Sequence, residues 1–380
     1  MSGDLTRDQD RMLLPFMGRQ WSWDAPWDMW AMSMYNTITS IAESPLAEGL
    51  LYIGTDDGLL QVSEDGGGSW RAIEVGSLPG VPDAAFVNDV KADLHDVDTV
   101  YVALDNHKLG DFRPYLLKST DRGRTWTSIA GDLPDRHLVW RVVQDHVDPD
   151  RMFAGTEFGV FFTVDGGGRW IELDGGVPTI SFRDLAIQRR ENDLVGATFG
   201  RGFYILDDYS VLREVSDDAL AEEAALFTTR PAWWYVERRP LGGDERAYQG
   251  AGFYTAPNPP FGAVFTYHLR DDLTTRESRR QKAEKPTIES GDDTPFAGWD
   301  AVEAERREPD PVILLTVRNA AGDVVRRIEG PATKGFHRVA WDLRFPAPDA
   351  LGTERSEWQG APRGYLAAPG SYTVTLSKRV

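Results

Sequence analysis

The chain has 380 residues, 41 of them Lys or Arg and 60 of them Asp or Glu, so its formal net charge is −19. Nucleic acids and anionic membranes bind basic surfaces, so this charge argues against either as the main partner. The sequence contains no cysteine, which excludes disulfides, thiolate nucleophiles and Cys-ligated zinc. The length and the 41% hydrophobic content predict two domains of ordinary core size.

The first notable segment is an aromatic stretch at residues 12–35. Charged residues interrupt it, so it has neither a signal-peptide core nor a clean membrane span. Two interpretations stay open. Exposed tryptophans stack on sugar rings, and Asp24 and Asp28 suit sugar hydroxyls; alternatively, the aromatic side chains of a long connecting loop pack onto the folded domain. The ligand-binding candidates here are Trp23, Trp27 and Trp30.

Three segments of the first half share the pattern Ser/Thr-x-Asp-x-Gly-x-x-Trp, at residues 63–70, 119–126 and 163–170. Their starts are 56 and 44 residues apart, and an insertion near residues 106–113 lengthens the first interval. The hydroxyl and the carboxylate suit the backbone amides of a hairpin turn, Gly allows positive φ, and Trp fills the gap between sheets. The predicted structural residues are Ser63, Asp65, Gly67, Trp70, Ser119, Asp121, Gly123, Trp126, Thr163, Asp165, Gly167 and Trp170.

Short strands surround these turns, for example at residues 50–55 and 58–62, and again at 152–156 and 159–163. A degenerate fourth unit without a Trp-terminated turn runs from residue 180 to 206. Four short strands to a unit, repeated at about 40–50 residues, predict the blades of a β-propeller.

These turns are similar to the Asp-box, or bacterial neuraminidase repeat, of sialidases, xyloglucanase-type propellers and the sortilin-type propeller. The phrases at residues 41–45, 54–58, 155–159 and 200–202 resemble more narrowly the large secreted bacterial "glycosyl hydrolase" or sortilin-like repeat proteins, and the resemblance extends through 255–260 and 330–341. It implies an all-β fold, an exported (periplasmic or extracellular) parent protein, a carbohydrate or peptide ligand, and no cofactor.

Closed propellers carry at least four blades, and often more, whereas only about four are visible here. Residues 3–8 echo residues 131–135, the segment that follows the second Asp-box. We therefore expect a partial propeller, the C-terminal portion of a longer repeat protein, whose missing N-terminal blades would pack on its first blade. The alternatives are a chance match and a complete four-blade propeller.

The second domain is predicted over residues 216–380, after a propeller domain over 1–215. Ser216 should cap a short helix over 216–225. Strands at residues 263–267, 312–317, 324–328, 337–341 and 371–376 suit an immunoglobulin- or fibronectin-III-like β-sandwich. The charged run 270–285 predicts an exposed helix ending at Pro286, either a solvated insertion or a partner-docking helix. An acidic loop should follow over 290–296.

Catalysis would require paired carboxylates, because glycosidases place two acids across the scissile bond. The best candidates are Asp56, Asp57, Asp105 and Glu157, which follow strands in loops predicted to line one mouth of the channel. The alternative is that these acids are polar tips of ordinary hairpins. The Asp-box aspartates are expected to be structural.

Other chemistry is less supported. A sialidase would need an arginine cluster and a nucleophilic tyrosine, and only Arg183, Arg201 and Tyr204 are near comparable positions; Arg201 and Tyr204 remain ligand-binding candidates. The six histidines show no zinc-type spacing, so no metal site is predicted. The leading hypothesis is a glycan- or peptide-binding scaffold without catalytic activity of its own. The rivals are a glycoside hydrolase fragment and a sortilin-like peptide receptor.

Overall fold

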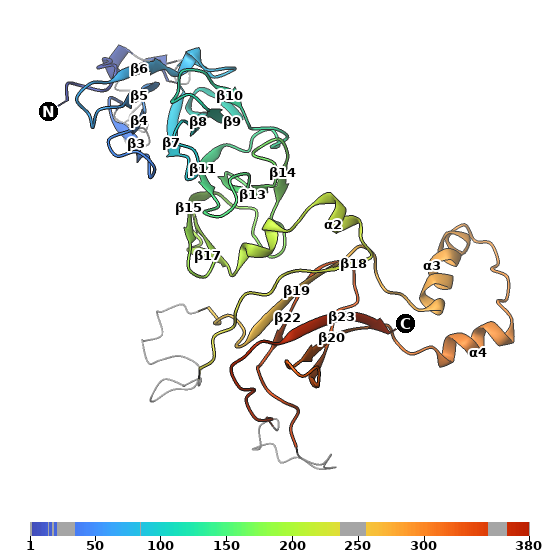
Figure 1. Cartoon of the computed structure of the whole chain (residues 1–380). Helices are drawn as coiled ribbons and strands as arrows, with labels where there is room; N and C mark the ends of the chain where they lie inside the picture. The colour runs from blue at the N-terminus through green and yellow to red at the C-terminus, as the bar shows by residue number, and fades with distance from the viewer. Residues whose placement is uncertain are drawn as a thin grey trace, which may run out of the picture. The chain divides into compact units, whose positions relative to one another are not determined.

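A computed structural model describes residues 2–13, 15–16, 19–20, 35–83, 85–235, 256–348 and 363–379. The chain divides into two compact units, Met1–Arg213 (unit 1) and Glu214–Val380 (unit 2). Both are built mainly of antiparallel strands (Figure 1). The tryptophans of residues 21–34 lie outside the described residues. No helix in the described part of the chain has the length and apolar character needed to cross a membrane.

Unit 1 contains four antiparallel sheets whose strands follow one another in chain order. We call these sheets blades 1 to 4. Blade 1 comprises β3 (Ile38–Glu43), β4 (Leu51–Thr55), β5 (Leu59–Ser63) and β6 (Arg71–Glu74). Blade 2 comprises β7 (Phe86–Ala92), β8 (Val100–Asn106), β9 (Asp111–Ser119) and β10 (Thr127–Ser128). Blade 3 comprises β11 (Val139–Gln144), β12 (Met152–Thr156), β13 (Gly159–Thr163) and β14 (Trp170–Glu172).

Blade 4 has three strands, β15 (Phe182–Gln188), β16 (Asp193–Thr198) and β17 (Phe203–Leu206). The blades succeed one another along unit 1 in Figure 1. They are consistent with the propeller blades that the repeat predicts. A two-stranded hairpin, β1 (Pro15–Phe16) and β2 (Arg19–Gln20), and short 3₁₀ turns complete the unit: η1 (Arg11–Leu13), η2 (Val75–Ser77), η3 (His107–Leu109) and η4 (Tyr209–Arg213).

Each Asp-box forms the hairpin between the third and fourth strands of its blade. In the second box, Ser119 Oγ donates to Asp121 Oδ1 at 2.7 Å and accepts from Gly123 N at 2.8 Å. Equivalent bonds join Thr163 to Asp165 and Gly167 at 2.8 and 3.0 Å. The hydroxyl and the carboxylate therefore hold the turn, as their pattern predicts.

Hydrophobic cores lie between successive blades. Trp126 packs against the core shared by blades 1 and 2, and Trp170 is buried in the core between blades 2 and 3. A third core joins blades 3 and 4. Among the described residues, no such core joins blade 4 to blade 1, so these four sheets do not close into a ring by themselves.

Glycines in the second strands let the next blade approach closely. A Cβ on Gly54 would lie 2.2 Å from Val87 Cγ1, and one on Gly155 would lie 2.9 Å from Phe182 O. The threonine that follows each of these glycines forms a hydrogen bond across the adjacent hairpin. Leu59 N donates to Thr55 Oγ1, and Thr156 Oγ1 donates to Gly159 O. The repeated Gly-Thr phrase thus has a packing role and a turn-forming role.

The innermost strand of every blade carries a β-bulge at the same place. The register shifts between Ile38 and Ser40 in β3, Val87 and Asp89 in β7, Val139 and Arg141 in β11, and Phe182 and Asp184 in β15. The residues at the bulges are Thr39, Asn88, Trp140 and Arg183. Thr39 Oγ1 donates to Val87 O at 2.6 Å, and Asn88 Nδ2 donates to Val139 O at 2.9 Å. In blades 1 and 2, the bulged side chain therefore ties its blade to the next.

The segment before blade 1 and the segment after the second Asp-box each bury a leucine. Leu5 is buried and its carbonyl accepts from Gln61 Nε2 at 3.1 Å. Leu133 is buried between blades 2 and 3, beside Asp132, whose Oδ1 accepts from Trp170 N at 2.7 Å. The leucine of each of the two echoing segments is therefore buried.

Unit 2 contains two three-stranded antiparallel sheets. One has the order β18 (Ala224–Leu226), β19 (Ala263–Leu269) and β22 (Gly335–Trp341). The other has β20 (Val312–Arg318) between β21 (Val324–Gly330) and β23 (Thr373–Arg379). Residues of both sheets, such as Tyr267 and Leu315, share one hydrophobic core. The immunoglobulin- or fibronectin-like character of this unit stays a prediction.

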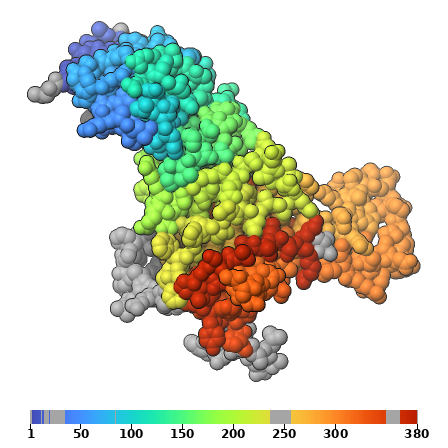
Figure 2. All heavy atoms as spheres, viewed as in Figure 1, coloured from blue at the N-terminus to red at the C-terminus, as the bar shows by residue number. Residues whose placement is uncertain are grey.

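The helices of unit 2 correct the sequence expectations. The helix predicted over residues 216–225 is α2 (Asp217–Ala221), capped by Ser216, and a strand follows it. The helix predicted over 270–285 is α3 (Arg276–Glu289), which begins six residues later because Thr275 supplies its N-cap, and it continues through Pro286 instead of ending there. A further helix, α4 (Trp299–Arg307), was not predicted. The atoms of α3 and α4, orange in Figure 2, form a projecting lobe of unit 2.

Candidate functional site

The four blades have two chemically different ends. The Asp-boxes of blades 1 to 3 connect the third and fourth strands, whereas the predicted acids lie at or just after the ends of the second strands of the same blades. Because consecutive antiparallel strands reverse direction, these two sets of hairpins lie at opposite ends of each sheet. We call the end that carries residues 55–59, 106–111, 156–159 and 198–203 the mouth end. The bulged starts of β3, β7, β11 and β15 lie at the same end.

In blade 1, the two predicted acids are buried and hold local structure. Asp57 accepts from Thr55 Oγ1 at 2.5 Å and from Arg7 N at 2.7 Å. Asp56 Oδ1 accepts from Thr37 N at 2.8 Å. Burial raises the pKa of Asp56, although the bond from Thr37 opposes the rise. Both carboxylates fasten the hairpin to the chain that precedes it.

In blade 2, Asp105 lies at the end of β8 and is buried. Its Oδ1 is hydrogen-bonded to His107 Nδ1, in the turn of the lengthened β8–β9 hairpin. The His107 ring stands edge-on to Trp140 of blade 3, with 5.8 Å between the ring centroids. The insertion near residues 106–113 thus places a histidine against the next blade.

In blades 3 and 4, Glu157 joins an aromatic and cationic stack. Trp140 Nε1 donates to Glu157 Oε2 at 3.0 Å. The Arg183 guanidinium lies 3.6 Å from the Trp140 ring centroid, 5.5 Å from that of Phe199, and 3.7 Å from Glu157 Oε2. Arg183 is therefore placed between two aromatic side chains, and Phe199 is 74% exposed.

These contacts connect three blades at the mouth end. We call the connected residues the mouth cluster: Asp105, His107, Trp140, Glu157, Arg183 and Phe199. Two of the four predicted acids, Asp105 and Glu157, belong to it. Asp56 and Asp57 make their hydrogen bonds elsewhere.

The other predicted ligand-binding residues are not members of the mouth cluster, and three of them lie outside the described residues. Arg201 is exposed in the β16–β17 hairpin. Tyr204 packs on Phe182 at 5.9 Å in the core between blades 3 and 4. Trp23, Trp27 and Trp30 fall outside the described residues.

Sequence reasoning did not place His107, Trp140 and Phe199 in the site, and Arg183 appeared only in the rejected comparison with sialidases. Their positions in the repeat could have identified Trp140 and Arg183. Each stands near the start of an innermost strand, at the β-bulge that lies at the mouth end. β-Bulges commonly re-aim side chains near functional sites.

The two acids of the mouth cluster differ in exposure. A glycosidase needs two carboxyl groups that face a substrate. Asp105 is buried against His107, whereas the Glu157 side chain is 31% exposed and holds Trp140. Within the described residues, no group of three or more histidine, aspartate or glutamate side chains is arranged to hold a metal ion.

No protein-family model matches this sequence, and no curated protein matches it. Solved structures show distant similarity to Asp-box-type β-propellers. An ancestral GH74 enzyme has a TM-score of 0.35 at 20% identity, and the match covers 44% of this chain and 22% of that one. Ycf48 bound to D1 peptide has a TM-score of 0.35 at 17% identity, and the match covers 46% of this chain and 52% of that one.

The extracellular domain of a two-component system protein from B. thetaiotaomicron has a TM-score of 0.33 at 16% identity, covering 44% of this chain and 20% of that one. The chain thus spans from about a fifth to about half of the length of these structures. These structures include an enzyme and a protein bound to a peptide.

Proposed function

We propose that unit 1 binds a neutral glycan at the mouth cluster without cleaving it. The observation that carries this proposal is the stack of Trp140, Arg183 and Phe199 beside Glu157, built from two neighbouring blades. An exported location, expected from the family resemblance, belongs to the same proposal.

Charge pairing within the cluster favours a neutral ligand. Asp105 is bonded to His107, and Glu157 accepts from Trp140 with Arg183 nearby. Because each carboxylate already has a partner, an ionic ligand would have to compete with these contacts. A sugar hydroxyl can both donate and accept, so it adds to such groups without displacing them.

The exposed ring of Phe199 supplies the second element of sugar recognition. The C–H face of a sugar is apolar and stacks on aromatic rings, while its hydroxyls reach polar groups at the rim. The Phe199 ring lies beside the polar groups, with its centroid 5.5 Å from the Arg183 guanidinium. A sugar ring lying on Phe199 would bring its hydroxyls toward Arg183 and Glu157.

The test is a Phe199→Ala variant measured on a glycan array and then by calorimetry with the best neutral oligosaccharide. We expect the variant to weaken binding by about tenfold, since a stacked aromatic contributes about 0.5–1.5 kcal/mol beyond the apolar area that it buries. Phe203→Ala is the matched control, because Phe203 is also 74% exposed and is not one of the mouth-cluster residues. Equal losses in both variants, or no glycan binding by the wild type, would refute the proposal.

Hydrolysis is the alternative that the same reagents test. Glu157→Gln keeps an acceptor for Trp140 but removes the carboxylate. The proposal predicts no release of reducing ends by either protein. Release by the wild type that disappears in Glu157→Gln would establish a glycoside hydrolase instead.

A further inference from the structure

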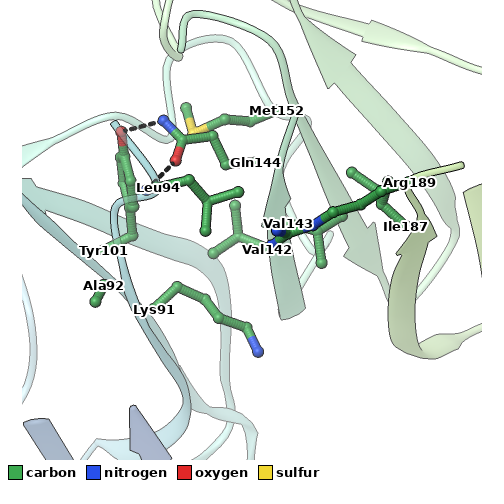
Figure 3. Close-up of a pocket in the computed structure, with 10 residues that line it drawn as sticks. All are labelled: Lys91, Ala92, Leu94, Tyr101, Val142, Val143, Gln144, Met152, Ile187 and Arg189. Atoms are coloured by element: carbon green, nitrogen blue, oxygen red, sulfur yellow. Dashed lines mark hydrogen bonds between the residues drawn. The ribbon is translucent and has the colours of Figure 1, made fainter. Parts of the chain in front are cut away.

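A second candidate site lies at the opposite end of the innermost strands. It is a cavity of about 170 Å³ between the ends of β7, β11 and β15, which we call the inner pocket (Figure 3). Val142 and Val143 of β11 lie centrally among the residues that line it, with Lys91 of β7 and Ile187 of β15 to either side. Arg189, which directly follows β15, is also part of its lining.

One wall of the inner pocket is polar but already satisfied. Gln144 Oε1 accepts from Leu94 N at 2.8 Å, and Gln144 Nε2 donates to Asp93 Oδ2 at 2.8 Å. Tyr101 OH donates to Asp93 Oδ2 at 2.7 Å. These bonds hold the wall in place. Gln144 and Tyr101 therefore shape the pocket, and a charged group of a ligand would have to bind to other residues.

The two charged residues that line the inner pocket are both basic. Lys91 Nζ lies 3.5 Å from Asp89 Oδ1, but that buried carboxylate also receives Arg141 Nη1 at 3.1 Å and Val142 N at 3.2 Å. Among the ion pairs of the described residues, none involves Arg189. The chain as a whole has a net charge of −19. The inner pocket is a local exception, because two cations and no carboxylate lie in its partly apolar lining.

We infer that the inner pocket binds a small organic anion, a carboxylate attached to an apolar body no larger than one ring. The valines and Ile187 receive the body, and Lys91 and Arg189 bind the carboxylate by charge-assisted hydrogen bonds. The size follows from the cavity, because roughly 150 Å³ suffices for a benzene ring. Either a free acid or the C-terminal residue of a peptide supplies this chemistry.

The experiment measures binding of 3-phenylpropionate to the full chain by calorimetry, with 3-phenylpropanamide as the neutral analogue. We expect saturable binding of the acid and at least about tenfold weaker binding of the amide, because the amide lacks the charge. A second pair, Gly-Gly-Phe and its C-terminal amide, separates the sources. Binding of the free peptide points to a chain terminus, and binding of the acid alone points to a free small molecule.

Variants locate the site. Arg189→Met and Lys91→Met should each weaken binding of the acid about tenfold. Arg190→Met is the matched control, since it removes the same charge one residue away, from a side chain paired with Glu191. It should change the affinity less than twofold. Ala92→Leu, which fills part of the cavity, should abolish binding while thermal melting reports whether the fold persists.

The inference is overturned if neither carboxylate binds saturably, if acid and amide bind equally, or if Arg189→Met and Arg190→Met have the same effect. Phe199→Ala at the mouth end should leave this affinity unchanged, so the outcome is independent of the glycan proposal.

Discussion

The hydroxyl of each Asp-box makes two bonds at once. Ser119 is buried, donates to Asp121 Oδ1 and accepts from Gly123 N. Water cannot replace either bond without entering the turn, and an unpartnered buried N–H is costly. The identity of this single residue should therefore matter to the stability of blade 2.

Removal of the Ser119 hydroxyl should destabilise the fold. Ser119→Ala should lower the free energy of unfolding by about 1–2 kcal/mol, measured by urea denaturation. Ser119→Thr is the control, because the third box has Thr163 at the same position with the same bonds. Similar losses in both variants would mean that volume, not hydrogen bonding, sets the cost.

The Asp-box carboxylates predict a pH dependence. Hydrogen bonds from Ser69 Oγ and Ser69 N lower the pKa of Asp65 to about 2. Hydrogen bonds from Thr125 also lower the pKa of Asp121. An unfolded aspartate titrates near roughly 3.9, so this stabilisation is complete above about pH 4 and is lost as the pH falls toward about 2.

Asp65→Asn isolates this contribution, since the amide does not titrate there. Thermal melts should show the wild type losing more stability than the variant between about pH 4 and pH 2. Burial raises the pKa of Asp56 and of Asp89. These two groups change the stability in the opposite direction as the pH falls, but they are present in both the wild type and Asp65→Asn. Parallel pH profiles would contradict the assigned bonds.

At the scale of single residues, the sequence predicts contacts that are local along the chain. The Asp-box bonds join residues two to four positions apart, so their spacing is visible as a motif. The bond from Trp140 to Glu157 spans 17 positions, and the Arg141 to Asp184 pair spans 43. Such contacts depend on how the blades pack, which the motif does not encode.

Among the elements, α3 shows how local propensity can be overridden. Pro286 lacks the N–H that a helix interior uses, yet the helix continues to Glu289. Arg280 joins this helix to α4 through Glu305 at 2.8 Å and pairs with Glu284 at 3.0 Å. Contacts of this kind, which a linear reading does not show, help to hold the helical pair together.

The proline should still limit the helix. Pro286→Ala should increase helical circular dichroism and stabilise α3 locally by up to about 3 kcal/mol, because alanine restores the missing donor. Lys285→Ala is the control, because Lys285 is an exposed neighbour of the proline and its Nζ lies 3.8 Å from Glu289 Oε1. Unchanged or reduced helicity in Pro286→Ala would contradict this interpretation.

The strands were easier to predict than the helices. Alternation and turn residues located β4, β5, β12 and β13 and most strands of unit 2, whereas α4 was missed entirely. Its nine residues, Trp299–Arg307, combine five charged side chains with an exposed tryptophan. Nine residues are fewer than the stretch over which a helical hydrophobic period can be recognised in a sequence.

For the whole molecule, repetition links the fold to the candidate site. Each blade places a hairpin and a bulge at the mouth end, so successive blades bring their variable residues together. The sequence predicted that Asp56, Asp105 and Glu157 would line one mouth of the channel, because corresponding loops recur with the repeat. Asp105 and Glu157 belong to the mouth cluster, whereas Asp56 bonds to Thr37. The sequence did not predict that Asp56 and Asp57 would be buried by the chain before blade 1, since that contact is not part of the repeat.

Glycan binding at the mouth cluster can be tested most directly through the NMR signal of the Trp140 indole N–H, assigned with a Trp140→Phe variant. Titration with a neutral oligosaccharide selected on the array should shift this signal saturably, because Trp140 Nε1 is bonded to Glu157 inside the proposed site. The indole N–H of Trp170, bonded to Ile129 O between blades 2 and 3, should not move. A bound oligosaccharide that leaves the Trp140 signal unchanged would contradict the account.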